Sequence, residues 1–292
     1  MGDVRQSPEW ARFMVSLGWE AGKLSSGYVY SKRLPLIGSI LKIPKIGPDI
    51  DFAHLEKLSK EKRVLFTKIE PDVLDTDSAV KRALEKNGFQ SDRWSLQPTK
   101  TLVVGLTPSQ EEILARMEKD TRYSIRAAAK RGVKVEKTND LEIFWRLYSE
   151  TSKRGSFWIT RKEAETLWKV FNETGKAALL IAYYDNEPLA ASFLLFHEKT
   201  AYYYHAASSG KRRDLFATYY VVWQSLLEAK KRGCTRFDLM GIADSRIPST
   251  RSWGGFTHFK RGFGGEEVTY LGSFIKVYNP ILKPIFWLNK LF

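Results

Sequence analysis

The segment AALLIAYYDNEPLAASFLLFHEKTAYYYHAA, which runs from Ala177 to Ala207, decides the fold. It contains three apolar runs of strand length, separated by turn residues. The first two runs are Ala177 to Tyr184 and Pro188 to Phe196, and the residues Asp185-Asn186-Glu187 between them predict a hairpin. The third run is Ala201 to Ala207. The segment therefore predicts three consecutive β-strands.

A long helix is predicted after these strands, because apolar residues recur at helical spacing from Leu215 to Leu226 and the pattern stops near Gly233. The run from Arg236 to Met240 predicts one more strand. The order hairpin, strand, long helix, strand resembles the core of GNAT-type acyltransferases. Upstream lie three further predicted helices, at Lys119–Arg131, Asp140–Lys153 and Arg161–Thr174.

In the first hundred residues, predicted helices and strands alternate in a similar but less regular order. Helices are predicted at Ser7–Leu17, Asp51–Lys60 and Asp77–Asn87, and strands at Arg63–Ile69 and Thr101–Leu106. We therefore expect an α/β (α+β) fold with two GNAT-like acyltransferase domains and no coiled-coil arm. The expected boundaries are 1–106 for the first domain and 107–265 for the second. Residues 266–292 are expected to pack back on the first domain.

Composition narrows the class of protein. The 292 residues carry a formal net charge of +14, which favours a polyanionic partner such as nucleic acid, a nucleotide diphosphate or an anionic membrane surface. A single cysteine, Cys234, excludes an internal disulfide and a cysteine-based zinc site. Residues 1–10 lack the apolar core of a signal peptide, and no apolar run is long enough to span a membrane. The expected location is the cytoplasm.

Several common kinds of catalytic site have no sequence signature in this chain. The four histidines, His54, His197, His205 and His258, lie in different elements without the spacing of metal ligands, so no metal is expected. The turn at 208–217, before the long helix, has one glycine among bulky residues and fits the pyrophosphate of coenzyme A poorly. An acyl donor other than acyl-CoA is therefore favoured.

The segment WGGFTHFKRGFGG, from Trp253 to Gly265, is the strongest candidate for chemistry. Glycines allow a backbone to approach a ligand closely, and Lys260 could place a point charge on a phosphate or on a developing oxyanion. The alternative is a glycine-rich surface loop with solvated charges. Asp238, at the end of its predicted strand, is a fallback general base, although a local hydrogen bond is the simpler role.

The helix at Lys119–Arg131 offers a second candidate site. Its basic residues at three- and four-residue spacing form one stripe, Lys119, Arg122, Arg126 and Lys130. Such a stripe can follow a nucleic-acid backbone. The alternative is a solvated helix face without a partner.

Several motifs taken in order resemble the FemABX family of peptidoglycan-bridge aminoacyltransferases. They are Trp10-Ala11-Arg12, the stretch from Thr121 to Arg126, Lys130-Arg131-Gly132-Val133, Lys153-Arg154-Gly155 followed by Ile159-Thr160-Arg161, and Phe259-Lys260. The resemblance covers most of residues 7–265 and is strongest from 96 to 265. The sequence shows no long helical hairpin inserted in the second domain, which some members use as a coiled-coil arm, and the first domain is short for the family.

The resemblance implies transfer of an amino acid from aminoacyl-tRNA to a stem-peptide amine of a UDP-linked or lipid-linked peptidoglycan precursor. Lys260 would stabilise the oxyanion, and Phe259 would shape the pocket for the tRNA end. Arg12 and Arg161 would hold the acceptor diphosphate, while the basic stripe would contact tRNA. No cofactor and no metal are implied, since the donor ester is already activated. Peripheral contact with the inner face of the membrane is also implied.

Two other functions remain open from the sequence. One is a GNAT-like N-acyltransferase that uses acyl-CoA or another donor on an envelope sugar or a peptide amine. The other is a tRNA- or membrane-binding protein without transfer activity. The apolar and basic tail at 279–292 fits either a helix docked on the first domain or a helix lying on a membrane surface.

Overall fold

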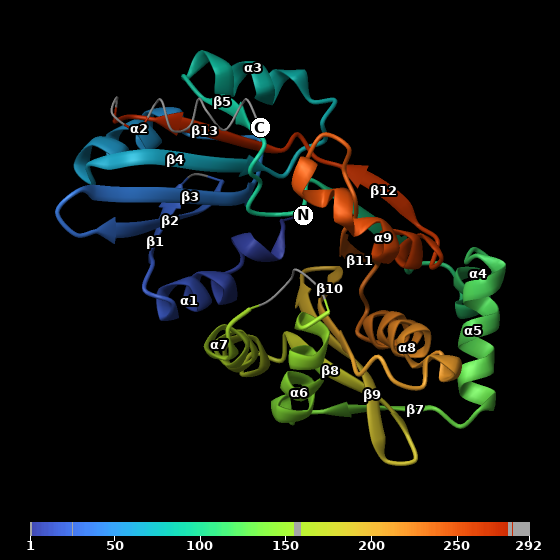
Figure 1. Cartoon of the computed structure of the whole chain (residues 1–292). Helices are drawn as coiled ribbons and strands as arrows, with labels where there is room; N and C mark the ends of the chain where they lie inside the picture. Colours follow the sequence, from blue (N-terminus) through green and yellow to red (C-terminus); the bar gives the residue numbers. More distant parts are fainter. Residues whose placement is uncertain (1, 25, 155–158, 280–281, 283–292) are drawn as a thin grey trace. The chain divides into compact units, whose positions relative to one another are not determined.

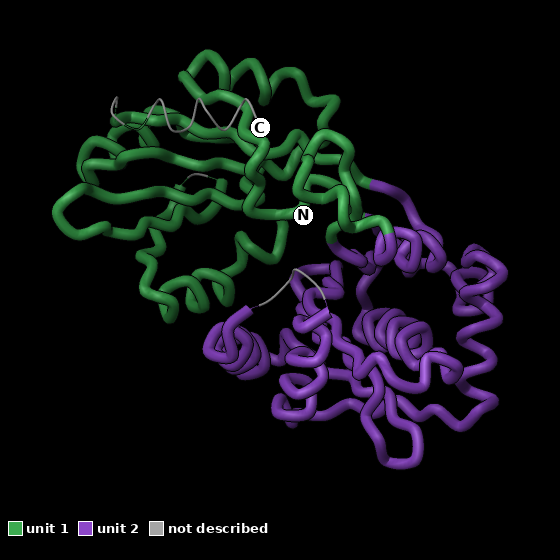
Figure 2. Tube along the Cα trace, in the orientation of Figure 1, with its two compact units in different colours: residues 1–101, 241–254, 268–292 green, residues 102–240, 255–267 purple. Residues whose placement is uncertain are grey.

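The computed structural model describes residues 2–24, 26–154, 159–279 and 282, which form two compact units (Figures 1 and 2). The first unit consists of residues 1–101, 241–254 and 268–292, and the second of residues 102–240 and 255–267. The segment 241–254 therefore belongs with the N-terminal part of the chain, although it follows the last long helix in sequence.

The first unit is built on a mixed six-stranded sheet with the order β1-β2-β3-β4-β13-β5 (Figure 1). Only β3 and β4 run parallel among its paired neighbours. The strands are β1 (Glu20–Leu24), β2 (Gly27–Leu34), β3 (Gly38–Ile46), β4 (Val64–Pro71), β5 (Gln90–Asp92) and β13 (Ser273–Val277). The C-terminal strand β13 thus lies inside this sheet, between β4 and β5. The rest of the tail, at 280–281 and 283–292, is outside the described residues.

Three α-helices of this unit begin where the sequence places capping residues. They are α1 (Pro8–Ser16), α2 (Phe52–Glu61) and α3 (Ser78–Lys86), and they follow a 3₁₀ turn at Val4–Gln6. Ser7, Asp51 and Asp77 each accept a hydrogen bond from a backbone N–H of the first turn, which confirms the predicted helix starts. The core is apolar, with Leu41 and Ile69 of the sheet and Leu55 of α2 almost completely buried.

The second unit contains most of a seven-stranded sheet with the order β12-β6-β11-β10-β9-β8-β7. Its strands are β6 (Lys100–Gly105), β7 (Lys134–Thr138), β8 (Ala177–Tyr184), β9 (Glu187–His197), β10 (Thr200–Ser208), β11 (Arg236–Gly241) and β12 (Glu266–Thr269). The predicted hairpin joins β8 to β9, with Asp185 and Asn186 at φ values of 48° and 64°. The strand β11 pairs in parallel with β10, as a crossover through a helix requires.

The helices of the second unit are α4 (Gln110–Ala115), α5 (Lys119–Lys130), α6 (Leu141–Ser152), α7 (Arg161–Asn172), α8 (Ala217–Lys231) and α9 (Gly254–Arg261). The long helix predicted from the Leu215–Leu226 pattern is α8, which packs on β8 and β9 and against α5. Capping boxes open α4 at Ser109 and α7 at Thr160. Within the described residues, α8 is the longest helix, at 15 residues.

The glycine-rich segment differs from the loop interpretation of the sequence. A 3₁₀ helix at Pro248–Trp253 leads directly into α9, so Gly254 and Gly255 form the first turn of a helix. The loop interpretation is therefore wrong for the part that carries Phe259 and Lys260. Glycine has a low helix propensity. An eight-residue helix that begins with two glycines is therefore difficult to predict from the sequence.

Candidate active site around Lys260

Lys260 lies in the last turn of α9 with a half-buried side chain. Burial lowers the pKa of its ammonium group to about 8, and the charge of Asp238 opposes part of that shift. The Nζ atom lies 5.0 Å from the ring centroid of Phe256, one helical turn earlier. The lysine is therefore a cation in a partly desolvated environment, where its interaction with an anion is stronger than in water.

Asp238 lies on β11 and is buried, with 7% of its surface exposed. Its Oδ1 atom accepts a hydrogen bond of 2.6 Å from the backbone N–H of Met240. Met240 has a φ of 62°, so the residue that donates this hydrogen bond is in the left-handed conformation. Asp238 thus makes the local hydrogen bond considered from the sequence, and it also supplies the negative charge that acts on Lys260.

Phe259 belongs to a cluster of aromatic rings. Its ring centroid is 4.9 Å from that of Tyr219 on α8 and 5.2 Å from that of Phe263. Tyr219 and Phe263 are themselves stacked at 5.9 Å. Burial raises the pKa of Tyr219, and the charges of Asp120 and Glu118 raise it further. The sequence placed Tyr219 in the apolar stripe of a helix, but it gave no indication that this ring faces Phe259.

The glycines that follow Lys260 are explained by packing. The backbone carbonyl of Gly262 accepts a 2.9 Å hydrogen bond from the N–H of Glu118, at the start of α5. A Cβ atom on Gly262 would lie 2.3 Å from Oγ1 of Thr121, and one on Gly264 would lie 2.9 Å from the carbonyl oxygen of Arg116. These two glycines therefore allow the end of α9 to approach α5, and the approach of a ligand to this backbone stays a prediction. A Cβ on Gly254 or Gly255 would meet open space.

The four basic residues predicted to contact tRNA all lie on α5. Lys119, Arg126 and Lys130 are exposed, while Arg122 is half-buried. The Arg122 guanidinium donates hydrogen bonds to the carbonyl oxygens of Ala115 and Met117, where α4 ends. Arg122 therefore helps to fix the α4–α5 turn, and the other three side chains present their charges to solvent.

The two arginines predicted to hold a diphosphate belong to different units. Arg12 is exposed on α1 in the first unit. Arg161 is the first residue of α7 in the second unit, and it pairs with Glu142 at 2.6 Å and Glu165 at 2.7 Å. Because these carboxylates are more than half exposed, an incoming phosphate could replace them at little cost in free energy.

Arg154, from the Lys153-Arg154-Gly155 motif, holds a neighbouring loop of the second unit in place. Its guanidinium donates to the carbonyl oxygen of Ser209 at 3.0 Å and to the hydroxyl of Ser208 at 3.2 Å. A Cβ atom on Gly210 would lie 2.9 Å from one guanidinium nitrogen. Arg154 therefore holds the loop that precedes α8. The next residue of the motif, Gly155, is outside the described residues.

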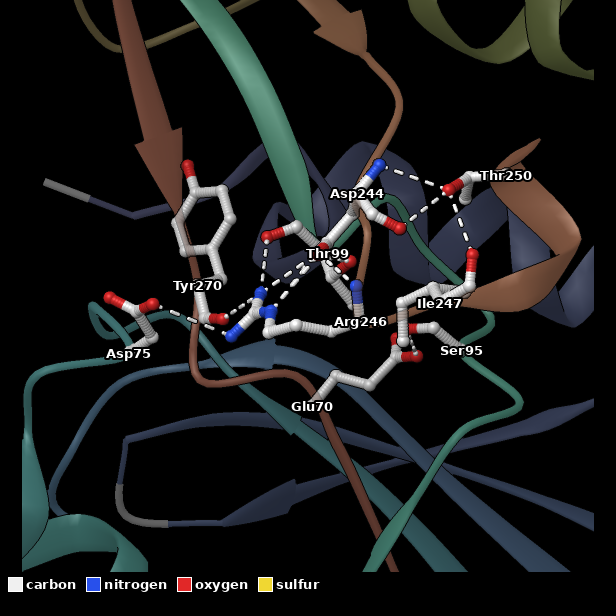
Figure 3. Close-up of polar contacts among 9 residues, drawn as sticks. All are labelled: Glu70, Asp75, Ser95, Thr99, Asp244, Arg246, Ile247, Thr250 and Tyr270. Atoms are coloured by element: carbon white, nitrogen blue, oxygen red, sulfur yellow. Dashed lines mark hydrogen bonds and ion pairs between the residues drawn. The ribbon is translucent and has the colours of Figure 1, made fainter. Parts of the chain in front are cut away.

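Sequence reasoning missed a polar network in the first unit, centred on Arg246 (Figure 3). Asp244 is buried and accepts hydrogen bonds from Nη2 of Arg246 at 2.7 Å and from Oγ1 of Thr99 at 2.5 Å. Burial alone would raise the pKa of Asp244, but these hydrogen bonds outweigh it and hold the pKa below its usual value. Arg246 also donates to the carbonyl oxygen of Tyr270 and pairs with Asp75. The network connects chain segments that lie far apart in the sequence.

Glu70 is a second buried group that the sequence did not single out. It lies in the same region of the first unit (Figure 3), and its Oε1 accepts hydrogen bonds from the hydroxyl of Ser95 and the N–H groups of Leu96 and Gln97. Burial raises its pKa in spite of these bonds and of the positive charge of Lys45. Glu70 thus ties β4 to the segment before β6.

In the described part of the chain, no group of three or more His, Cys, Asp and Glu side chains is arranged to hold a metal ion. Within the same residues, no helix is long and apolar enough to cross a membrane. The histidines lie on α2, β9, β10 and α9, and burial lowers the pKa of His205 to about 4.

Comparison with known proteins assigns the family. The FemAB family model matches residues 77–185 and 160–288, which together make up most of the chain. The chain belongs to the FemAB family. The α9 segment with Phe259 and Lys260 lies within the matched region, as do the α5 stripe and Arg161, whereas Arg12 lies before it.

Curated relatives of this FemAB protein include the lipid II:glycine glycyltransferase of Staphylococcus epidermidis, which is 25% identical over 221 residues. The match covers 64% of this chain and 52% of the relative. The enzyme of the same name from Staphylococcus aureus is 25% identical over 215 residues and is covered to 51%. The chain therefore spans about half the length of the curated relatives that it matches.

Solved structures show the fold of this FemAB protein. The crystal structure of FemX matches 98% of this chain and 95% of its own with a TM-score of 0.82, at 19% identity. The C-terminal domain of a putative lysylphosphatidylglycerol synthetase from Agrobacterium fabrum matches with a TM-score of 0.60, at 13% identity. The predicted α/β fold class is confirmed, with two mixed sheets, and so is the resemblance to the FemABX family.

Proposed function

We propose that this FemAB protein transfers an amino acid from aminoacyl-tRNA to a stem-peptide amine of a UDP-linked or lipid-linked peptidoglycan precursor. The observation that carries this proposal is the half-buried Lys260 on α9, whose pKa is about 8 and which lies beside the aromatic cluster of Phe259. Family membership and the names of the lipid II:glycine glycyltransferases support the same reaction.

In the proposed reaction, the neutral acceptor amine attacks the ester carbonyl carbon of the donor, forming a C–N bond. The carbonyl oxygen becomes an oxyanion, and the Lys260 ammonium stabilises it by charge and by a donated hydrogen bond. The C–O bond to the ribose then breaks, and the departing ribose oxygen receives the proton that the amine loses. With a pKa of about 8, Lys260 is mostly protonated at neutral pH, as this role requires.

The remaining partners follow from charged groups on the surface. Arg12 and Arg161 are the proposed cations for the diphosphate of the precursor, and Lys119, Arg126 and Lys130 are the proposed contacts with the phosphates of tRNA. Arg122 has a smaller part in that contact, because it already donates to two carbonyls. The proposed location is the cytoplasm, with peripheral contact at the inner face of the membrane, where a net charge of +14 favours anionic lipids.

The test is single-turnover transfer with a pool of tRNA charged with labelled amino acids. Soluble UDP-linked and lipid-linked precursors serve as acceptors in parallel, and acetyl-CoA serves as the rival donor. Label that appears on either precursor supports the proposal, and the labelled amino acid identifies the donor. Consumption of acetyl-CoA with an amine, while the label stays on tRNA, would replace the proposal with an ordinary N-acyltransferase.

A further inference from the structure

Tyr123 on α5 is an aromatic side chain with 58% of its surface exposed. In the described part of the chain it shares this property with one other large aromatic residue, Trp94 of the first unit, at 67%. A single exposed ring needs no explanation. Tyr123 differs because it is the outer end of a row of rings.

This row runs through the second unit from α5 to α9. The ring of Tyr123 lies 6.0 Å from that of Phe216, which lies 6.3 Å from that of Tyr219. Tyr219 in turn lies 4.9 Å from Phe259, the residue before Lys260. We call Tyr123, Phe216, Tyr219 and Phe259 the aromatic row. It connects an exposed ring in the basic stripe to the candidate catalytic lysine.

Phe216 occupies its place in the row at an energetic cost. It has a φ of 54° at the start of α8, a left-handed conformation that costs a bulky residue about 1–2 kcal/mol. Arg131 fixes the arrangement, with its guanidinium 5.2 Å from the Phe216 ring centroid and a hydrogen bond to the carbonyl oxygen of Asp214. Glycine or asparagine would adopt this φ at a lower cost. The presence of phenylalanine therefore suggests that its ring has a role at this position.

Exposed cations lie on the two elements that carry Tyr123 and Phe216. Arg126 and Lys130 are exposed on α5, and the loop before α8 exposes the run Lys211-Arg212-Arg213. Two of these loop cations have partners on the surface, since Lys211 pairs with Glu187 and Arg212 with Asp214. Aromatic rings among cations are the features with which proteins bind single-stranded nucleic acid, because bases stack on the rings and phosphates pair with the cations.

We propose that Tyr123 and Phe216 form a stacking platform for unpaired nucleotides at the 3′ end of the donor RNA, which leads the esterified ribose toward Lys260. This inference rests on the proposed function, in which the donor is an aminoacyl-tRNA. Bases stack on Tyr123 and Phe216, and the adjoining phosphates contact Arg126 and Lys130. Tyr219 and Phe259 continue the row to the reacting ester.

The experiment measures the affinity of the full chain for a fluorescent RNA hairpin with a single-stranded 3′ overhang, and for the same hairpin with a blunt end. Stacking on an aromatic side chain is worth about 1–3 kcal/mol per base, so Tyr123→Ala should weaken overhang binding about 5- to 150-fold. Binding of the blunt hairpin should not change. Tyr123→Trp should retain the overhang affinity, and Phe216→Gly, which suits the observed φ, should weaken it.

The matched control is Trp94→Ala, which removes the exposed aromatic residue of the first unit and should leave both affinities unchanged. The salt dependence of overhang binding should keep its slope in Tyr123→Ala, because the tyrosine neutralises no phosphate. Circular dichroism melting shows that each variant is folded at the temperature of the assay. Unchanged overhang affinity in folded Tyr123→Ala, or an equal loss on the blunt hairpin, overturns the platform.

These measurements separate the platform from the proposed function, since RNA binding needs no transfer. Overhang binding that depends on Tyr123 in a protein without transfer activity would leave the platform standing and remove the proposed reaction. Transfer from aminoacyl-tRNA with the same KM in wild type and Tyr123→Ala would leave the reaction standing and remove the platform.

Discussion

Each unit contains a cation close to a buried aspartate, Arg246 beside Asp244 in the first unit and Lys260 near Asp238 in the second, but the surroundings of the two cations differ. In the first unit, Arg246 donates to the carboxylate of Asp244 and the carbonyl of Tyr270, and it pairs with Asp75. In the second unit, Lys260 lies near the ring of Phe256, and burial lowers its pKa to about 8. The acceptors around Arg246 join distant segments of the first unit, whereas burial disfavours the charged form of Lys260, so an anion bound beside Lys260 would stabilise that charge.

The largest effect expected from this comparison is on transfer by Lys260→Ala. Loss of a group that stabilises an oxyanion lowers a rate about 100-fold, and we expect at least a tenfold loss in the single-turnover rate. Circular dichroism melting checks that the Lys260→Ala protein is folded at the temperature of the assay. Lys260→Arg, which keeps a cation, should retain more activity than Lys260→Ala. Equal rates in wild type and Lys260→Ala would place the lysine outside the mechanism.

The corresponding change in the first unit should affect stability instead. Asp244→Ala leaves Thr99 and Arg246 without their shared acceptor, which should lower the free energy of unfolding by about 1–3 kcal/mol. Urea denaturation measures this loss, with Thr250→Val as a milder change in the same network. A stable Asp244→Ala protein that had lost transfer would reverse the assignment of roles to the two regions.

The pH dependence of transfer sharpens the role of Lys260. Its pKa of about 8 lies below the ordinary lysine value of 10.5, so the cation is lost as the pH rises through 8. Over the same range the acceptor amine becomes more nucleophilic, so the wild-type rate should stop rising near pH 8. In Lys260→Arg the cation persists, and the rate should continue to rise. Single-turnover rates measured from pH 6.5 to 9.5 test this difference. If the rates of both proteins stop rising at the same pH, the change does not come from Lys260.

The smallest effect concerns the basic stripe of α5. Arg126→Ala should weaken RNA binding a few-fold and reduce the slope of log affinity against log salt by about 0.7–0.9, the value for one lost phosphate contact. Arg122→Ala should change that slope less, because its guanidinium is engaged by the carbonyls of Ala115 and Met117. Salt titrations of both variants test the difference, and identical slopes in the two variants would show that these carbonyls do not restrain Arg122.

Local sequence signals predicted most of the fold. Capping residues such as Ser7, Asp51 and Asp77 mark where helices begin, and the Asp185-Asn186 turn marks the hairpin. These features act over a few residues, so one sequence is sufficient to find them. The helix α9 escaped prediction because its opening glycines are poor helix formers and its stability comes from packing.

Contacts between distant segments could not be predicted in the same way. Thr99 and Asp244 are separated by 145 positions, and nothing local to either indicates the hydrogen bond between them. The contact of Gly262 with Thr121 is of the same kind, and the sequence assigned that glycine to ligand binding. Lys260 itself was found from its glycine-rich segment and from the family resemblance, but its lowered pKa depends on the burial that only the structure shows.

The position of β13 has a consequence for how the protein is made. In the first sheet β5 is paired with β13 and with no other strand of the described chain, so residues 273–277 are the bridge that joins β5 to β4. The unit that leaves the ribosome first is therefore the one completed last, after the second unit has been synthesised. Until then the edge of β4 is open, and a chain interrupted before Ser273 would keep that edge available for pairing with other chains. The oldest part of the nascent chain is thus the last to complete its sheet.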